Sequence, residues 1–201
     1  MYPLFETIRY KNGVAENLLL HQQRVDHALM HLGANEKITL STIIADQPYK
    51  PSIHNQVYKC RLSYDLAGNS FVEFEPYSIR NIQTISIQDI GANQYALKYS
   101  DRQWINNMMS ISGTDEVIFT QDGFIKDASY ANLVFYDGTN WITPSNPLLL
   151  GTRRAQLLHN GIIKHAPIQI KDLSSFSSVK LVNAMMLWEE SPILDITWLN
   201  S

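Results

Sequence analysis

The run of residues from 115 to 145, DEVIFTQDGFIKDASYANLVFYDGTNWITPS, constrains the fold more than any other part of the chain. Short stretches rich in β-branched and aromatic residues are separated by turn signals at Asp122-Gly123 and Asp137-Gly138. Asp-Gly pairs favour tight hairpin turns, and short apolar stretches between such turns are typical of strands. The run therefore predicts a β-meander of consecutive antiparallel strands.

Helical patterns lie on both sides of this meander. Residues 17–33, NLLLHQQRVDHALMHLG, carry leucine and valine at helical spacing and end at a glycine. The segment TRRAQLLHNG predicts a second helix that begins just after Gly151. Shorter helices are expected within residues 37–47 and 101–111, and Ser100 is placed to cap the latter.

Further strand patterns occur before and after the meander: a hairpin around Asn12-Gly13, two paired strands around Gly68-Asn69, a strand at 84–90, and strands within 177–196. Strands and helices are mixed in both halves, so the fold class is α/β or α+β. A change of pattern at Pro76-Tyr77 places a domain boundary there. We expect a small N-terminal α/β domain over residues 1–77 and a larger C-terminal domain over residues 78–201.

Composition restricts the classes of function. The net charge of −3 argues against a general nucleic-acid or anionic-membrane binder, so any bound anion must be held by a local cluster. Cys60 is the single cysteine, which excludes an internal disulfide and fits the cytoplasm. The sequence has neither a signal-peptide pattern nor an apolar run of about 20 residues. We expect a cytoplasmic protein with no membrane partner.

The histidines of the first predicted helix suggest a metal site, but only weakly. His27 and His31 lie four residues apart, and His21 lies on the same segment. No HExxH motif accompanies them, and histidines on helix surfaces are common. We therefore predict no metal site.

Several polar residues stand in otherwise apolar or structurally special places. Lys98, in YALKYSDRQW, is a candidate amine nucleophile for an aldehyde cofactor. Gly151 and Thr152 precede or begin a helix, where free N–H groups suit a phosphate. Asp127 and Asn183 lie in strand-rich segments. Each has an ordinary structural alternative, such as a surface lysine, a turn aspartate or an N-cap threonine.

Taken together in order, these segments resemble the class IV aminotransferases, the fold-type IV pyridoxal-phosphate (PLP) enzymes. FETIR and NLLLHQQRVDHAL resemble the opening strand and helix of that family, and LKYSDRQ resembles its lysine segment. GFIKDASYANLVF, ITPS and LLLGTRRAQLL follow its later motifs in the same order. The resemblance implies a two-domain fold like that of D-amino-acid aminotransferase. Family members usually have a longer segment before FET, so we expect a shortened N-terminal domain.

The resemblance also implies a role for each matched residue. Lys98 would bind the PLP aldehyde covalently and, once released, move the substrate proton. Asp127, where the family usually has glutamate, would face the pyridine nitrogen, either from closer range or through a water. The remaining residues fall into two groups. The phosphate would be held by Arg24, Gly151, Thr152, Asn183 and Ala184, and a substrate carboxylate would be met by Arg9 and Thr7.

Two reactions suit such a site. The Asn183-Ala184 pair and the compact chain favour a lyase that converts 4-amino-4-deoxychorismate to 4-aminobenzoate and pyruvate, a step of folate biosynthesis. The main alternative is transamination of branched-chain or D-amino acids, and a non-catalytic cofactor-binding homologue is a third. The resemblance further implies a homodimer.

Overall fold

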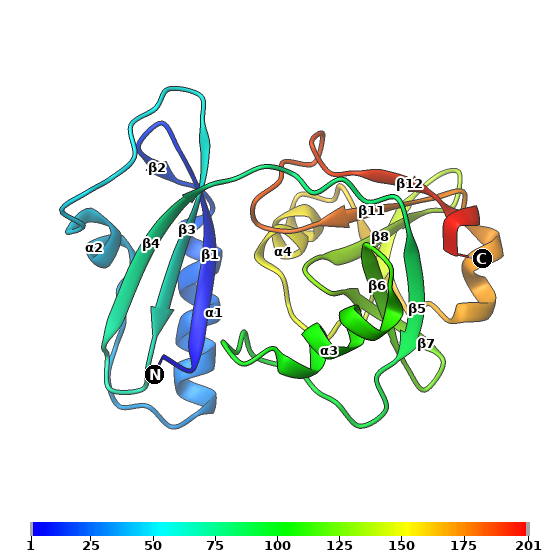
Figure 1. Ribbon diagram of the computed structural model, residues 1–201, viewed down its shortest axis with the longest axis horizontal. Helices are drawn as coiled ribbons and strands as arrows, with labels where there is room; N and C mark the ends of the chain where they lie inside the picture. Colours follow the sequence, from blue (N-terminus) through cyan, green and yellow to red (C-terminus); the bar gives the residue numbers. More distant parts are fainter. Residues whose placement is uncertain (1, 200–201) are drawn as a thin grey trace. The chain divides into compact units, whose positions relative to one another are not determined.

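The computed structural model describes residues 2–199, which divide into two compact units (Figure 1). The N-terminal unit comprises the chain up to Ile79 together with Leu97–Asp101. The C-terminal unit comprises Arg80–Ala96 and the chain from Arg102 onward. The boundary expected from the sequence, after residue 77, is close to Ile79, where the chain first passes from one unit to the other. The sequence-based division placed residues 97–101 in the second domain. These residues cluster with the N-terminal unit because their backbone pairs with β1, as described below.

The N-terminal unit is an antiparallel sheet with two helices. Its strands follow the order β2-β1-β3-β4 and span Val14–Ala15, Leu4–Lys11, Val57–Tyr64 and Ser70–Pro76 respectively. The predicted hairpin is confirmed, with Asn12 at φ 50° and Gly13 at φ 81° in its turn. Helices α1 (Leu18–His31) and α2 (Leu40–Ala45) confirm the two helices predicted for this half.

The alternation of β1 assigns its side chains to two faces of the sheet. Leu4, Ile8 and Tyr10 share a buried apolar cluster with Val25 and Leu29 of α1. Glu6 lies on this same face, between Leu4 and Ile8. Phe5, Thr7 and Arg9 lie on the opposite face. Both faces of β1 are largely buried, which is unusual for an antiparallel strand with one helical layer.

The C-terminal unit is built on a larger, mostly antiparallel sheet in the order β10-β9-β8-β7-β6-β5. The predicted meander is confirmed as β6 (Glu116–Gln121), β7 (Phe124–Ala128), β8 (Asn132–Tyr136) and β9 (Trp141–Pro144). The remaining strands are β5 (Ile85–Asp89), β10 (Lys164–Ala166), β11 (Ser178–Val182) and β12 (Ile193–Asp195). Strand β8 also pairs with β11, which in turn pairs with β12.

Two α-helices and two 3₁₀ turns complete this unit. Helix α4 (Thr152–His159) begins where the sequence predicted, whereas α3 (Gln103–Ser112) has Arg102 at its N-cap position, so the predicted Ser100 cap is wrong. The 3₁₀ turns are η1 (Ile170–Ser175) and η2 (Ile196–Leu199). The core fills with aliphatic side chains of β6, β8 and β11, such as Ile118, Leu133 and Leu181. Within residues 2–199, no helix has the length and apolar character needed to cross a membrane.

Candidate active site

Lys98 is held at the edge of the N-terminal sheet by backbone pairing. The Phe5 N–H donates to the Lys98 carbonyl at 3.1 Å, and the Ser100 N–H donates to the Pro3 carbonyl at 2.8 Å. Leu4 and Tyr99 form an antiparallel bridge. Strand β2 pairs only with the far end of β1, so this end of β1 has an open edge for the lysine segment. Lys98 is half-buried, and its Nζ lies 4.7 Å from the centroid of the Phe5 ring.

Arg24 is fixed by a buried carboxylate on the helix-facing side of β1. Glu6 is fully buried and accepts hydrogen bonds from Arg24 Nε at 2.9 Å and Arg24 Nη2 at 2.5 Å. His21, one turn earlier on α1 and also fully buried, lies with Nδ1 2.6 Å from Glu6 Oε2. A forked contact of this kind orients the guanidinium plane as well as balancing its charge.

The electrostatics of this cluster are dominated by burial and by Arg24. Burial alone would raise the pKa of Glu6, but the charge of Arg24 and the hydrogen bond with His21 outweigh it and lower this pKa to about 2. Burial lowers the pKa of His21, and the nearby positive charges of Arg24 and Lys98 add to that effect against the pull of Glu6. His21 is therefore neutral at pH 7 and donates its Nδ1–H to the Glu6 carboxylate.

Thr7 and Arg9, the residues predicted to meet a substrate carboxylate, lie together on the other face of β1. Arg9 is 2% exposed and its Nε pairs with Glu16 Oε1 at 3.2 Å. Thr7 is half-buried and pairs in register with Arg61 of β3. Lys98, Arg24, Thr7 and Arg9 thus all belong to the N-terminal unit.

Asp127 is the centre of a second cluster, in the C-terminal unit. It is the penultimate residue of β7 and pairs in register with Asn132, the first residue of β8. Its Oδ1 accepts from Asn132 Nδ2 at 2.7 Å, and its Oδ2 accepts from the Leu149 N–H at 2.9 Å. Asn132 Nδ2 also donates to the Leu149 carbonyl at 2.9 Å. The network joins the β7–β8 turn to the segment that leads into α4.

Burial raises the pKa of Asp127 to about 6, despite the donors from Leu149 and Asn132 and the nearby charge of Arg154. Arg154 does not form a direct ion pair with it. Its Nε donates to Thr143 Oγ1 at 3.1 Å and its Nη2 donates to the Pro144 carbonyl at 2.8 Å. Asp127 is therefore ionised at pH 7, with its charge only partly offset by neighbouring groups.

Gly151 and Thr152 lie directly after this network, at the N-terminus of α4. A Cβ at Gly151 would lie 1.9 Å from Asn132 Oδ1, so only glycine permits the close contact between this segment and β8. Thr152 is 3% exposed. First-turn N–H groups have no partner within a helix, and together with the helix dipole they favour an anion at this end.

Asn183 and Ala184 follow β11 and are half-buried. Asn183 Oδ1 accepts from the Met185 N–H at 2.8 Å, and its Nδ2 lies 3.5 Å from the Tyr130 carbonyl. Arg102 donates to the Ser129 carbonyl in the same β7–β8 turn. The structure therefore brings Asp127, Gly151, Thr152, Asn183 and Ala184 together around this turn.

Sequence reasoning missed two buried polar residues of these clusters, Glu6 and Asn132, and considered His21 only as a weak metal ligand. A signal existed for the pairing of Glu6, because His21 and Arg24 are three residues apart on one helix face and Glu6 shares the strand face that meets it. His27 and His31 stack on each other at 6.2 Å between ring centroids, away from buried His21. Among residues 2–199, no group of three or more histidine, cysteine or acidic side chains could hold a metal ion.

Comparisons with known proteins decide the family. The sequence profile of the family Amino-transferase class IV matches residues 97–190. A crystal structure of a candidate 4-amino-4-deoxychorismate lyase from Haemophilus somnus is 33% identical, covers 92% of this chain and 97% of its own, and superposes with a TM-score of 0.84. The chain belongs to the class IV aminotransferase family. An uncharacterized protein of Haemophilus influenzae is 35% identical over 92% of this chain and 98% of its own length.

A more distant solved structure shows the same fold. A candidate amino-acid aminotransferase from Mesorhizobium loti is 22% identical, covers 90% of this chain and 94% of its own, and superposes with a TM-score of 0.73. The mixed α/β architecture is therefore confirmed as that of fold-type IV.

Each cluster, taken by itself, contains groups that suit PLP, the cofactor that this family implies. Asp127 is a buried, ionised acid of the kind that stabilises a protonated ring nitrogen. Each carboxylate oxygen has a second lone pair beyond the hydrogen bond it already accepts, so both oxygens retain acceptor capacity. The N-terminus of α4 suits a phosphate, and Lys98 supplies an amine that can bond to an aldehyde.

Proposed function

We propose that this protein is a PLP-dependent lyase that converts 4-amino-4-deoxychorismate to 4-aminobenzoate and pyruvate. The observation that carries the proposal is the likeness to the Haemophilus somnus candidate lyase, which extends over nearly all of both chains. A Schizosaccharomyces pombe candidate aminodeoxychorismate lyase is also 31% identical over 96 residues, 47% of this chain and 37% of that one.

When bound, PLP would withdraw electrons from the carbon that carries the substrate nitrogen. Lys98 Nζ would hold the cofactor and, after the substrate amine replaces it, take the proton from that carbon. Asp127 would place a carboxylate against the ring nitrogen. Gly151, Thr152 and Asn183 would hold the phosphate, with Arg24 as a further cation for it, oriented by Glu6.

Removal of the proton is common to elimination and to transamination. In elimination, the C–O bond to the enolpyruvyl group breaks, the ring becomes aromatic and the released group leaves as pyruvate. This outcome needs no second amino acid. In transamination, Lys98 would instead deliver the proton to the cofactor, the amino group would stay on the cofactor, and an oxo acid would be released.

The deciding assay incubates purified protein and PLP with 4-amino-4-deoxychorismate and measures pyruvate and 4-aminobenzoate. The lyase releases both in equal amounts. Amino transfer from an amino acid to 2-oxoglutarate, with 4-amino-4-deoxychorismate left intact, would instead establish an aminotransferase.

The variant Lys98→Ala tests the cofactor proposal without relying on turnover. We expect wild-type protein to show the visible absorbance of lysine-bound PLP and the variant to lose it. Wild-type protein that takes up no added PLP would point to a non-catalytic homologue. We also propose the homodimer that the family implies, which sedimentation equilibrium tests directly.

A further inference from the structure

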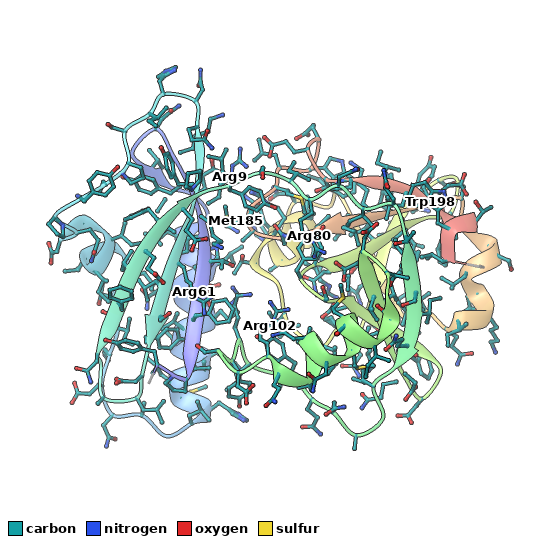
Figure 2. The ribbon with its side chains drawn as sticks, in the orientation of Figure 1. Arg9, Arg61, Arg80, Arg102, Met185 and Trp198 are labelled. Atoms are coloured by element: carbon teal, nitrogen blue, oxygen red, sulfur yellow. The ribbon has the colours of Figure 1, made fainter. Side chains whose placement is uncertain are left out.

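Arg61 has an unusual environment on the sheet of the N-terminal unit. Figure 2 labels Arg61 and Arg9 on this sheet. Arg61 lies on β3 in register with Thr7, so its side chain shares the sheet face of Phe5, Thr7 and Arg9. Its guanidinium carbon is 3.8 Å from the centroid of the Phe5 ring. Within residues 2–199, that guanidinium makes neither a hydrogen bond nor an ion pair. A half-buried arginine with five N–H donors and no acceptor is ready to receive an anion.

The stacking on Phe5 places Arg61 close to the reactive lysine. Lys98 Nζ lies 4.7 Å from the centroid of the same ring. Phe5 is 3% exposed, so both cations contact a ring that is otherwise covered. Two groups that contact one phenyl ring lie within the span of a single small-molecule substrate. A substrate whose amine replaces Lys98 on the cofactor aldehyde would therefore extend within reach of Arg61.

Two neighbouring cations on this face differ from Arg61 in having a carboxylate partner: Arg9 pairs with Glu16 at 3.2 Å and Lys59 pairs with Glu75 at 2.6 Å. Glu73 lies opposite Arg61 in the β3–β4 register, yet the two form no ion pair in the described part of the chain. Stacking on an aromatic ring fixes the plane of a guanidinium, and its fork matches a carboxylate through two parallel hydrogen bonds. A lysine in this place would provide charge without that geometry.

We propose that Arg61 binds the ring carboxylate of the substrate, the one that 4-aminobenzoate retains, and thereby determines specificity. The inference deepens the proposed function and rests on it for the identity of the substrate. Each product of the lyase reaction carries one carboxylate, so the substrate carries two. Arg9 is already paired with Glu16, so Arg61, rather than Arg9, provides a position for one of these two carboxylates.

The test uses a pair of ligands that differ only in charge, 4-aminobenzoate and 4-aminobenzamide. Their affinities for PLP-loaded protein are measured by calorimetry with wild type, Arg61→Met and Arg61→Lys. We expect Arg61→Met to bind 4-aminobenzoate about 10- to 100-fold more weakly than wild type, because it loses hydrogen bonds to a charged group. Arg61→Lys should lose less, and the affinity for 4-aminobenzamide should stay unchanged. Lys11→Met removes the same charge from the same face at the far end of β1 and should bind both ligands like wild type.

Three results would overturn the proposal: equal affinity of wild type for the two ligands, an unchanged affinity of Arg61→Met for 4-aminobenzoate, or equal losses for both ligands. Visible absorbance of bound PLP and circular dichroism show whether Arg61→Met is folded. If it is not, the comparison of Arg61→Lys with wild type decides, and equal affinities would refute a requirement for the guanidinium fork. Failure of the lyase proposal appears separately, as no pyruvate from wild type.

Discussion

Replacing Glu6 with glutamine tests whether the buried carboxylate organises the N-terminal unit. At pH 7 the substitution removes the charge that balances Arg24, while keeping the size of the side chain. Breaking a buried, hydrogen-bonded charge pair by removing one partner costs about 3–5 kcal/mol. We therefore expect Glu6→Gln to lower the free energy of unfolding of this unit by about that amount at pH 7.

The pH dependence follows from the lowered pKa. Glu6 has a folded-state pKa of about 2 against an ordinary value of 4.5. A lowered folded-state pKa gives stability that is present above the unfolded-state value and lost as pH falls toward the folded-state value. The difference corresponds to about 3 kcal/mol in total, of which about 1 kcal/mol is lost by pH 4 and about 2 kcal/mol by pH 3. The variant lacks this titration, so its stability difference from wild type should narrow by these amounts.

The measurement must report on the N-terminal unit itself. All four tryptophans, at positions 104, 141, 188 and 198, lie in the C-terminal unit, so their fluorescence follows the other half of the chain. Hydrogen exchange of the β1 and β3 amides between pH 7 and pH 3, corrected for intrinsic rates, provides the required free energies. The stability difference between wild type and Glu6→Gln could instead stay constant between pH 7 and pH 3. That result would refute the claim that Glu6 is ionised in the folded protein with a lowered pKa.

Two further predictions concern the C-terminal cluster. Because the pKa of Asp127 is about 6, PLP affinity of the wild type should fall about tenfold for each pH unit below 6 as the carboxylate becomes protonated, whereas Asp127→Asn should bind PLP weakly and without this dependence. PLP titrations followed by visible absorbance between pH 5 and 8 measure both. Gly151→Ala should displace the Asn132 side chain, whose Oδ1 would lie 1.9 Å from the new Cβ, and weaken PLP binding at least tenfold. Asn132→Ala removes the side chain that the new Cβ would meet, so Gly151→Ala should weaken PLP binding less in that background than in wild type. Losses of PLP affinity that simply add in the double variant would contradict a steric cause.

Most of the fold could be predicted because local signals agreed with tertiary structure. The Asn12-Gly13 and Asp122-Gly123 turns contain residues at positive φ, and the strands beside them have the expected bounds. The pairing of residues 97–101 with β1 could not be predicted. It joins positions more than 90 residues apart, in a segment with no strand pattern of its own.

The site was predicted unevenly for a related reason. Lys98 and Asp127 stand out because a charged group in an apolar setting is conspicuous in a sequence. Asn132 does not, since an asparagine after a turn is ordinary, and its function depends on two donations that link Asp127 and Leu149 across the fold. Arg61 is hidden in the same way, because an alternating strand gives no sign of whether a cation has a partner.

The two buried acids show why burial alone does not determine what a carboxylate can do. Glu6 and Asp127 are both buried and both ionised at pH 7. Burial raises the pKa of each and neighbouring groups lower it, but the neighbours outweigh burial at Glu6 and do not at Asp127. The fork of Arg24 neutralises Glu6, which leaves it as a support for that arginine. Arg154 instead donates its hydrogen bonds to Thr143 and Pro144, so no cation among residues 2–199 pairs directly with Asp127 and its negative charge is only partly balanced. A protonated pyridine nitrogen is the kind of cation that would complete its environment, and this difference supports our proposal that Glu6 positions Arg24 while Asp127 meets the cofactor.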